Sequence, residues 1–431
     1  MKTVIMAGGK GTRISSVASD IPKPMIRIGD MPVLEHEIMC LRDQGFCDLI
    51  ITVCHLGHII MDYFGDGSKL SPVTGNPFGV HIEYFVEEQP LGNAGALFKI
   101  RDKLTEDFLL LNADAVFDID FNRFVEYHKQ KGGLVTLFTH PNSHPYDSGL
   151  IIANNNCAVE QWLAKEDERP KYYRNRVNAG IHVISPKVLE CKIDTPQIDL
   201  DRQLLKPLAG TGKMFVYDSP EYVKDMGTPD RYETVCRDFM NGTVQAKNLK
   251  QKQKAIFLDR DGTINKYIGF LRNINDFDLI DGVSDAIKKI NNSGFLAIVV
   301  TNQPVIARGE VTFGELQEIH NKMETLLGLD GAYLDGIFFC PHHPHKGYDG
   351  EIEELKIDCE CRKPKPGMLF KAAECFNIDL SESWMIGESE NDIAAGIAAG
   401  CRTGLLGYEQ YGQDISGTSL VAILESVLEN K

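Results

Sequence analysis

The sequence predicts an α/β protein built from two Rossmann-like domains. Short apolar runs alternate with longer amphipathic stretches, this alternation stops near Met240, and it begins again at Ala255. Such alternation is typical of βαβ units, in which helices cover a mostly parallel sheet. A chain of 431 residues also exceeds the size of one typical core. We therefore expect domains at residues 1–240 and 255–431, joined by a polar, basic linker at 241–254.

The expected strands follow the apolar runs in order along the chain. Six runs precede residue 240, and we expect strands at 3–9, 49–57, 81–88, 108–117, 133–140 and 179–185. Four runs follow the linker, and we expect strands at 255–262, 295–303, 336–343 and 384–392. Amphipathic stretches such as PVLEHEIMCLRDQ, at 32–44, separate the runs and predict the covering helices.

Composition limits the partners and the compartment. The formal net charge of −16 argues against nucleic acid as the main partner, because that binding needs clustered Lys and Arg. No apolar run has the length of a membrane span, and MKTVIMAGGKG reaches glycine too early for a secretory signal. Six of the eleven cysteines are scattered singly from Cys40 to Cys236, unlike a disulfide framework. We expect a cytoplasmic protein that contacts no membrane and no nucleic acid; homo-oligomerisation is left open.

A glycine-rich loop follows the first expected strand in AGGKGTR. Gly8, Gly9 and Gly11 lack Cβ atoms, so their backbone N–H groups can approach an anion closely. Arg13 and Lys23 add fixed positive charge beside the loop. The spacing matches neither the P-loop nor the dinucleotide fingerprint. The loop therefore predicts a polyphosphate site of another kind.

The motif GGKGTR…PKPM resembles that of the sugar-1-phosphate nucleotidyltransferases. Four further segments agree in order: EEQPLGNAGAL, LNADAVFDID, VNAGIHVIS and VKDMGTPDRY. The resemblance covers about the first 235 residues and implies a glycosyltransferase-A-like mixed sheet. It also implies attack by a sugar phosphate oxygen on the α-phosphorus of a nucleoside triphosphate, with pyrophosphate leaving. Positioning and charge neutralisation would supply most of that catalysis.

The same resemblance assigns roles to residues of the first domain. It implies catalytic roles for Lys23 and Arg13, and an Mg²⁺ ion held by Asp114 and Asp225. The nucleotide-binding residues that it implies are Gly8, Gly9, Gly11, Thr12, Glu87 and Gly92. The sugar-phosphate-binding residues that it implies are Lys165, Asn178 and Gly180; Lys165 is equally well explained as a solvated surface charge.

The segment ISSVASDIPKPM is most similar to the branch of that family that acts on D-glycero-D-manno-heptose 1-phosphate with a guanine nucleotide. Glu87, in VEEQPLG, falls where family members read the base. A carboxylate only accepts hydrogen bonds, which suits the paired N–H donors of guanine. We therefore expect GTP and heptose 1-phosphate as substrates of the first domain.

Two aspartates stand two residues apart after the first expected strand of the second domain, in FLDRDGTIN. Asp259 and Asp261 point to the same side of an extended segment. Two carboxylates over one site can act as nucleophile and general acid/base beside a metal. A calcium-binding loop is the alternative, but it needs more oxygen ligands closer together.

The DRDGTIN run resembles the haloacid dehalogenase (HAD) superfamily of phosphatases, which implies a HAD-like parallel sheet. Asp259 would form an aspartyl-phosphate, while Asp261 would protonate the leaving alcohol and later activate water. The phosphate-binding residues that the resemblance implies are Thr301, Asn302, Arg362 and Lys363. The implied Mg²⁺ ligands are Asp259, Asp261, Glu388 and Asp392. GESEND carries glutamate where the family has aspartate, so Glu388 and Asp392 both remain candidates for the main ligand.

A cysteine cluster lies in CPHHPHKGYDGEIEELKIDCEC. The ligand set Cys340, His342, Cys359 and Cys361 would form a closed tetrahedral zinc site, which is structural rather than catalytic. His343 and His345 are alternatives to His342 that the spacing does not exclude. A redox role for C-x-C is less consistent with the adjacent histidines. The expected zinc loop would deliver Arg362 and Lys363 to phosphate.

The segments TNQPVIARGE, CPHHP and CECRKPKPGM extend the second resemblance to the histidinol-phosphatase and heptose-bisphosphate phosphatase group, and they resemble the D-glycero-D-manno-heptose 1,7-bisphosphate 7-phosphatases. We therefore expect a bifunctional enzyme that dephosphorylates heptose 1,7-bisphosphate at position 7 and transfers GMP to heptose 1-phosphate. The nearest alternative keeps both chemistries on another sugar bisphosphate or another nucleotide. A sugar-nucleotide sensor without turnover is the alternative from another class, although a sensor has no chemical need for both Asp259 and Asp261.

Overall fold

The structure is a computed structural model that describes residues 1–9, 20–193 and 195–429. Contacts within the chain divide it into two units. Unit 1 comprises Met1–His140, Ile151–Ala164 and Asn178–Asn248. Unit 2 comprises Pro141–Leu150, Lys165–Val177 and Leu249–Lys431. Each unit contains its own sheet and its own hydrophobic cores.

The main sheet of unit 1 is mixed, as expected. Its central strands β5, β4, β1 and β6 are parallel, and β11 runs antiparallel to β6. These strands are β1 (Thr3–Met6), β4 (Asp48–Val53), β5 (His81–Val86), β6 (Phe108–Asn112) and β11 (Val177–Ile184). The sheet continues through β8 (Val135–His140), β9 (Leu150–Ala153), β10 (Val159–Leu163) and β12 (Met214–Asp218).

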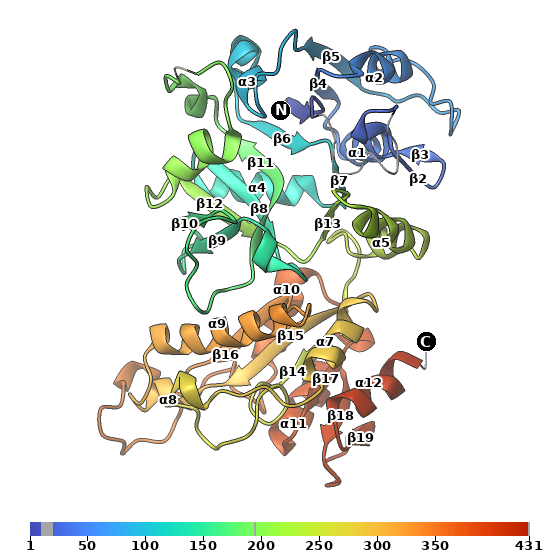
Figure 1. Cartoon of the computed structure of the whole chain (residues 1–431). Coiled ribbons are helices and arrows are strands. Elements are labelled where there is room, and N and C mark those ends of the chain that lie inside the picture. The colour runs from blue at the N-terminus through green and yellow to red at the C-terminus, as the bar shows by residue number, and fades with distance from the viewer. Residues whose placement is uncertain (10–19, 194, 430–431) are drawn as a thin grey trace. The chain divides into compact units, whose positions relative to one another are not determined.

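Helices cover both faces of this sheet because its strands are apolar on both faces. Ile5 and Leu111 pack in one core, whereas their neighbours Val4 and Leu110 pack in another. The first core includes residues of α1 (Val33–Arg42), α2 (Gly57–Phe64) and α4 (Phe121–Lys131). The second includes residues of α3 (Gly95–Lys99) and of the short helix η5 (Pro186–Glu190). Figure 1 shows how these helices surround the strands.

A small second sheet in unit 1 consists of β7 (Ala115–Asp118) and β13 (Tyr222–Asp225), which pair antiparallel. Helix α5 (Pro229–Met240) follows, and the Thr228 side chain caps its first turn by accepting from the Arg231 amide. The stretch 241–254 contains α6 (Thr243–Ala246), and Val244 and Leu249 within this stretch are buried. The limits of the two domains, 1–240 and 255–431, remain a proposal.

The main sheet of unit 2 is entirely parallel, as expected, with strand order β16-β15-β14-β17-β18-β19. The strands are β14 (Lys254–Leu258), β15 (Phe295–Asn302), β16 (Gly336–Cys340), β17 (Trp384–Gly387), β18 (Arg402–Leu406) and β19 (Ile415–Gly417). The helices are α7 (Val283–Asn291), α8 (Pro304–Ala307), α9 (Phe313–Leu329), α10 (Gly367–Phe376), α11 (Glu390–Ala399) and α12 (Leu420–Glu429). Each expected strand of this half thus coincides with an observed one.

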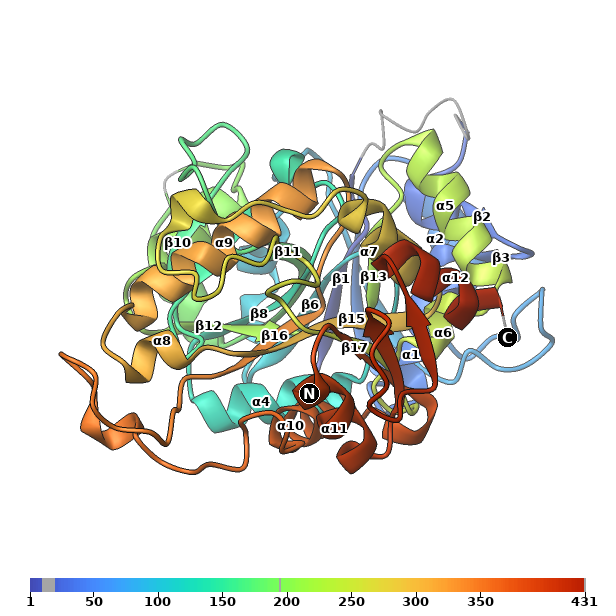
Figure 2. The ribbon, with the colours of Figure 1, turned by 90° about the horizontal axis from the view of Figure 1, so that it is seen from below.

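Successive side chains of β14 point to opposite faces of the sheet and pack against different helices. Ile256 and Leu258 pack in the core that includes α7, α9 and α12. Ala255 and Phe257 point to the opposite face, in the core that includes α10 and α11. Figure 2 shows helices on both sides of the strands. Because both faces are covered, the acidic residues that follow β14 can lie only at its carboxyl end.

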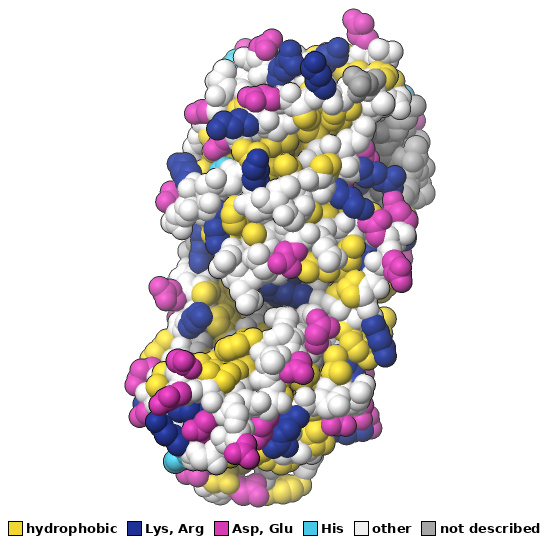
Figure 3. Space-filling model, turned by 90° about the vertical axis from the view of Figure 1, so that its left-hand side faces the viewer, with side chains coloured by type: hydrophobic (Ala, Val, Ile, Leu, Met, Phe, Trp, Pro, Cys, Tyr) yellow, Lys and Arg dark blue, Asp and Glu magenta, His cyan; other side chains and the backbone are white. Residues whose placement is uncertain are grey.

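Charged side chains of both signs are interspersed on the face that Figure 3 shows, with hydrophobic side chains between them. In the described part of the chain, no helix is both long enough and apolar enough to cross a membrane.

Candidate active sites

A cavity of about 530 Å³ lies in unit 1 where β1, β4 and β6 end. Ligands commonly bind outside the carboxyl ends of parallel strands, because the following loops converge there. Six expected site residues line the cavity: Gly8, Gly9, Lys23, Glu87, Gly92 and Asp114. Gly11, Thr12 and Arg13, also expected in this site, lie outside the described residues.

Lys23 and Asp114 form the charged centre of this cavity. Lys23 begins the short helix η2 (Lys23–Met25) between two prolines, and Asp114 lies in the turn between β6 and β7. The Nζ atom of Lys23 lies 2.8 Å from Oδ2 of Asp114. The lysine side chain is 10% exposed and the aspartate side chain 42% exposed, so the carboxylate faces the cavity. This pair brings an acid and a base that are far apart in sequence to one point.

Asp225 lies beside Asp114 because β13 pairs with β7 in a register that sets Asp225 opposite Ala115. Its carboxylate accepts from the Gly227 amide at 2.7 Å and from Nη1 of Arg231 at 2.8 Å. Burial raises the pKa of Asp225, but Arg231 and the Gly227 amide outweigh burial and hold that pKa below its usual value. Both aspartates are partly exposed and offer hard oxygen donors of the kind that a divalent cation takes; Asp114 is among the described residues that line the cavity, and Asp225 is not. Arg231 was not foreseen from the sequence.

Glu87 projects toward the glycine loop. Its Oε2 accepts from the Leu91 amide at 3.1 Å, and its Oε1 lies 3.1 Å from where a Cβ on Gly8 would stand. Any side chain at Gly8 would therefore crowd this carboxylate. Burial raises the pKa of Glu87, and the hydrogen bond from Leu91 lowers it in part. Gly92 has a φ of +78° and packs against the Ile198 backbone, so a side chain there would be strained.

Among the residues that the structure describes, the lining of the cavity includes none of the three expected sugar-phosphate residues. Gly180 packs against Asn112, which does line it: a Cβ on Gly180 would come within 2.4 Å of Nδ2 of Asn112. Asn178 accepts from the Gly180 amide and lies 3.0 Å from Nε2 of His182. Lys165 begins a stretch that belongs to unit 2. The structure thus relates Gly180 to the cavity through Asn112, whereas the role of Lys165 stays a prediction.

A second cavity, of about 210 Å³, lies in unit 2 at the carboxyl ends of β14, β15 and β17. All the expected phosphatase residues line it: Asp259, Asp261, Thr301, Asn302, Arg362, Lys363, Glu388 and Asp392. Nζ of Lys363 lies 2.8 Å from Oδ1 of Asp259, 2.5 Å from Oδ1 of Asp392 and 2.8 Å from the Val300 carbonyl oxygen. The lysine thus joins two carboxylates at the floor of the cavity.

Burial raises the pKa of two acids in this cavity, Asp259 and Glu388. Burial raises the pKa of Asp259 to about 6; Lys363 opposes this shift and Asp392 adds to it. Burial, followed by the nearby acids, raises the pKa of Glu388 to about 7. Asp392 uses Oδ1 for Lys363 and Oδ2 for the amide and hydroxyl of Ser389. Within the described part of the chain, the Glu388 carboxylate has no hydrogen-bond partner, so it is the acid free to take a cation.

Asp261 is held by residues that the sequence did not reveal. Nη2 of Arg260 donates to both of its carboxylate oxygens at 2.9 Å. Gln303 donates to Oδ2 at 2.9 Å, and Asn265 donates to Oδ1 at 3.1 Å. The side chain of Arg260 is fully buried behind the motif. One feature of the sequence points to this role of Arg260: it stands between Asp259 and Asp261. Successive side chains of an extended segment point to opposite sides, so the side chain of Arg260 points away from the cavity that the two acids line.

The remaining phosphate-binding candidates connect the cavity to the cysteine loop. Asn302 and the Lys363 backbone exchange two hydrogen bonds, at 2.9 and 3.0 Å. Thr301 accepts from Gln303 at 2.9 Å. Nη1 of Arg362 donates to the carbonyl oxygen of His342 at 3.2 Å. These bonds fix the loop before α10 against the end of β15.

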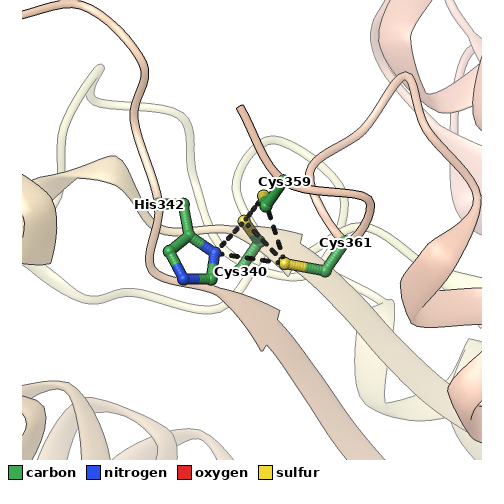
Figure 4. A group of neighbouring side chains, drawn as sticks. All are labelled: Cys340, His342, Cys359 and Cys361. Carbon is green, nitrogen blue, oxygen red and sulfur yellow. Dashed lines mark hydrogen bonds between the residues drawn. The ribbon is translucent and has the colours of Figure 1, made fainter. Parts of the chain in front are cut away.

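Cys340, His342, Cys359 and Cys361 converge in unit 2 (Figure 4). Their ligand atoms lie within 4.8 Å of one another. The Sγ atoms of Cys340 and Cys361 are 3.3 Å apart, far longer than a disulfide bond of about 2.05 Å. Three thiols and one imidazole nitrogen at this spacing fit tetrahedral zinc, in which bonds to sulfur are about 2.3 Å. His343 lies instead beside Arg308, at 3.2 Å, so the geometry selects His342 from the three histidines.

Comparisons with known proteins identify both halves. Residues 2–241 match the family described as nucleotidyl transferase, and residues 360–419 match the family described as HAD-hydrolase-like. D-glycero-beta-D-manno-heptose-1,7-bisphosphate 7-phosphatase of Yersinia pestis is 44% identical over 158 residues, which are 37% of this chain and 82% of that protein.

Two solved structures are similar to parts of the chain. HddC from Yersinia pseudotuberculosis has 24% identity and a TM-score of 0.47, and the match covers 55% of this chain and 99% of that one. D,D-heptose 1.7-bisphosphate phosphatase from B. bronchiseptica, complexed with magnesium and phosphate, has 30% identity and a TM-score of 0.36. That match covers 42% of this chain and 100% of that one.

The chain joins two enzymes. The nucleotidyl transferase family covers more than half of its residues, and the phosphatase relative matches most of its own length. The chain therefore belongs to the nucleotidyl transferase family through residues 2–241 and, through its HAD-type half, to the family of heptose-bisphosphate phosphatases.

Proposed function

We propose that this chain removes the 7-phosphate of D-glycero-D-manno-heptose 1,7-bisphosphate and then transfers GMP from GTP to the remaining 1-phosphate. The products would be GDP-heptose and pyrophosphate, made in the cytoplasm as an activated heptose for a bacterial surface glycan. The observation that carries the proposal is the 44% identity to a heptose-bisphosphate phosphatase over 82% of that relative. A nucleotidyltransferase on the same chain would consume the sugar 1-phosphate which that reaction leaves.

In the phosphatase site, Asp259 attacks the distal phosphorus and forms an aspartyl-phosphate while the sugar oxygen leaves. Asp261 gives that oxygen its proton, and afterwards takes a proton from the water that hydrolyses the aspartyl-phosphate. Lys363, 2.8 Å from Asp259, keeps the nucleophile ionised and oriented. The distal phosphate is released as inorganic phosphate, and Asp259 is restored.

A divalent cation fits among the acids of this site, since Glu388 has no partner in the described chain and the pKa of Asp259 is raised by burial. Mg²⁺ would be held by Asp259 and Glu388, with Asp392 behind them, and would neutralise the charge of the phosphate. The Asp261 carboxylate already accepts from Arg260, Asn265 and Gln303. We therefore assign the Asp261 side chain to proton transfer. Among the proposed metal ligands, its carboxylate is the least free to bind a cation.

In the transferase site, the residues position two anions. Gly8, Gly9 and Lys23 would contact the phosphates of GTP, together with Arg13 and its neighbours in the glycine loop. Asp114 and Asp225 would hold Mg²⁺, which would neutralise charge on the triphosphate. Glu87 would accept from the guanine edge through the oxygen that does not bind Leu91. The sugar phosphate oxygen then displaces pyrophosphate from the α-phosphorus.

The cysteine cluster would hold one structural zinc ion. Its donor set is closed, with four ligands from the protein, so it leaves no position for a substrate. Cys361 stands two residues before Lys363, so the ion would fix the loop that delivers Arg362 and Lys363 to the cavity.

The test uses the full chain with heptose 1,7-bisphosphate, GTP and Mg²⁺. We expect the parent protein to make GDP-heptose. Asp259→Asn should abolish that synthesis but leave conversion of heptose 1-phosphate intact, whereas Asp114→Ala should release inorganic phosphate without forming a sugar nucleotide. The exposed aspartates Asp349→Asn and Asp102→Ala are the matched controls.

Three results would count against the proposal. Phosphate release at the parent rate by Asp259→Asn would contradict the aspartyl-phosphate mechanism. A parent protein that turns over other sugar bisphosphates or nucleotides, but not these, would contradict the substrates. Tight binding without turnover would make the chain a sensor.

A further inference from the structure

Arg260 has an unusual place for a charged residue. Its side chain has no exposure to solvent, and it lies between the two acids of the proposed phosphatase centre. Nη2 donates to both oxygens of Asp261 at 2.9 Å and to Oε1 of Gln303 at 3.1 Å. A buried guanidinium needs an acceptor for each of its N–H groups, because water does not reach them. The acceptor for Nη1 therefore helps to hold the Arg260 guanidinium in place beside Asp261.

That acceptor is a histidine on a distant helix. His320 lies in the middle of α9 and is 2% exposed, and its Nε2 lies 3.2 Å from Nη1 of Arg260. Guanidinium only donates, so Nε2 of His320 must carry a lone pair, and the ring proton must sit on Nδ1. The ring of Phe339, with its centroid 5.7 Å away, packs against the imidazole. His320 is thus fixed as a neutral acceptor whose role in the chemistry has not been assigned.

We propose that His320 is a positioning residue for phosphate-ester hydrolysis, which acts through Arg260 to hold the carboxylate of Asp261 in the orientation for proton transfer. The proposal rests on the function proposed above for Asp261. The chain of contacts is continuous: imidazole to guanidinium at 3.2 Å, then guanidinium to both carboxylate oxygens at 2.9 Å. His320 and Arg260 are buried, and Asp261, at 18% exposed, is the member that reaches the cavity.

The geometry explains why removal of the His320 imidazole would change the orientation of the Asp261 carboxylate. Without His320, Nη1 of Arg260 would lose its acceptor at a position that water does not reach. Nη1 would then compete with Nη2 for the acceptors that Nη2 already uses, the two Asp261 oxygens and Oε1 of Gln303, and the bidentate contact with the Asp261 carboxylate would be lost. Proton transfer depends on the position of the acid/base, and misplacement of about 1 Å can cost about 100-fold in rate. Substrate binding would change little, because His320 does not line the cavity.

The test compares two amides at position 320 in the full chain. In His320→Gln, the longer amide can place its oxygen near the site of Nε2 and accept from Arg260. In His320→Asn, the shorter amide falls short of that site. We expect His320→Asn to lower kcat for phosphate release from heptose 1,7-bisphosphate about tenfold or more with KM within about twofold, and His320→Gln to stay within about threefold of the parent.

The controls separate catalysis from stability. Met323→Leu changes a fully buried side chain on the same helix that has no polar contact, and it should lower the melting temperature without lowering kcat. Asp259→Asn gives the background rate. Circular dichroism confirms that each variant is folded, and both amides keep a polar group at the site.

The outcomes are distinct. If both amide variants keep the parent kcat, or both lose it equally, the positioning role is wrong. A change confined to KM would also overturn it. If the parent releases no phosphate, or Asp259→Asn releases it at the parent rate, the proposed function itself fails and this inference fails with it.

Discussion

Lys363 Nζ lies 2.5 Å from Asp392 Oδ1, and the same nitrogen lies 2.8 Å from Asp259 Oδ1. The Lys363 side chain is 3% exposed, that of Asp392 is 1% exposed and that of Asp259 is 13% exposed. One cation therefore separates two carboxylates that would otherwise repel each other in a low-dielectric site. The raised pKa of Lys363 follows from these two acids, which outweigh the effect of burial.

Replacing Lys363 by methionine should abolish phosphate release, with a loss of more than about 100-fold. Removing one partner from a buried ion pair also costs about 3–5 kcal/mol of unfolding free energy, because the remaining charges stay buried. Denaturant unfolding and a phosphate-release assay measure the two effects. Lys365→Met, at a more exposed lysine nearby, is the control and should be nearly neutral. A fully active Lys363→Met would remove this lysine from the mechanism.

The pH dependence of stability should reflect the acids of the same cavity. Burial raises the pKa of Asp259 to about 6 and that of Glu388 to about 7. In the unfolded chain, carboxyl groups have a pKa of about 4. The folded protein thus binds more protons than the unfolded one between these values, so its stability is greatest at low pH in this window. In metal-free buffer, the unfolding free energy of unit 2 should fall as pH rises from about 4 to about 7.

Added Mg²⁺ should oppose this fall, because an ion that binds the ionised acids stabilises the folded state. Glu388→Gln should flatten the upper part of the pH profile in metal-free buffer and weaken the response to Mg²⁺. Thermal unfolding across the pH range, with and without the ion, measures both. A profile that is unchanged in Glu388→Gln would mean that another group titrates there.

Cys359→Ser should lower the zinc content of the full chain from one ion to a fraction of an ion. Loss of a structural zinc site should also lower the melting temperature of the phosphatase half and its activity, because the loop that carries Lys363 is no longer anchored. Elemental analysis and a phosphate-release assay measure these effects. Cys191→Ser changes an exposed cysteine in unit 1, and it should alter neither. A zinc-free parent with full activity would leave the cluster without this role.

Glu87→Gln should reduce the preference for GTP over other nucleoside triphosphates. The amide presents a donor where guanine needs an acceptor, and one lost polar match costs about 1–3 kcal/mol, or about 5- to 150-fold in discrimination. Relative kcat/KM values for four triphosphates measure the change. Glu88→Gln, at the exposed neighbour, should leave the preference as it is. An unchanged ratio in Glu87→Gln would assign base reading to another residue.

The fold was largely predictable from the sequence because parallel strands buried on both faces leave continuous apolar runs. Asp114 and Asp259 stand where apolar runs end, and Lys23 stands in the PKPM motif. The structure places all three beside cavities, and their roles stay predictions. The sequence could not identify Arg260 as a buried clamp. Its contacts depend on a helix some 60 residues away, and nothing local marks that pairing.

The choice between histidines shows the same limit. His342 and His343 are adjacent, and either spacing suits a metal site. In the structure, the backbone after β16 turns His342 to the cysteines and His343 to Arg308. Tertiary packing sets the direction of side chains in an irregular loop. The sequence spacing of Cys and His residues gives no information about that packing.

The arrangement of the cysteine loop has a consequence for how such sequences can vary. Cys340 and Cys361 meet at one point, so the 20 residues between them form a closed loop whose ends are tied together. Its tip, at residues 344–350, is mostly exposed. Lengthening a tied loop changes its closure entropy only slowly. Insertions and deletions at the tip should therefore be tolerated during evolution without moving Lys363, so the length of this loop is free to diverge while the catalytic geometry stays constant.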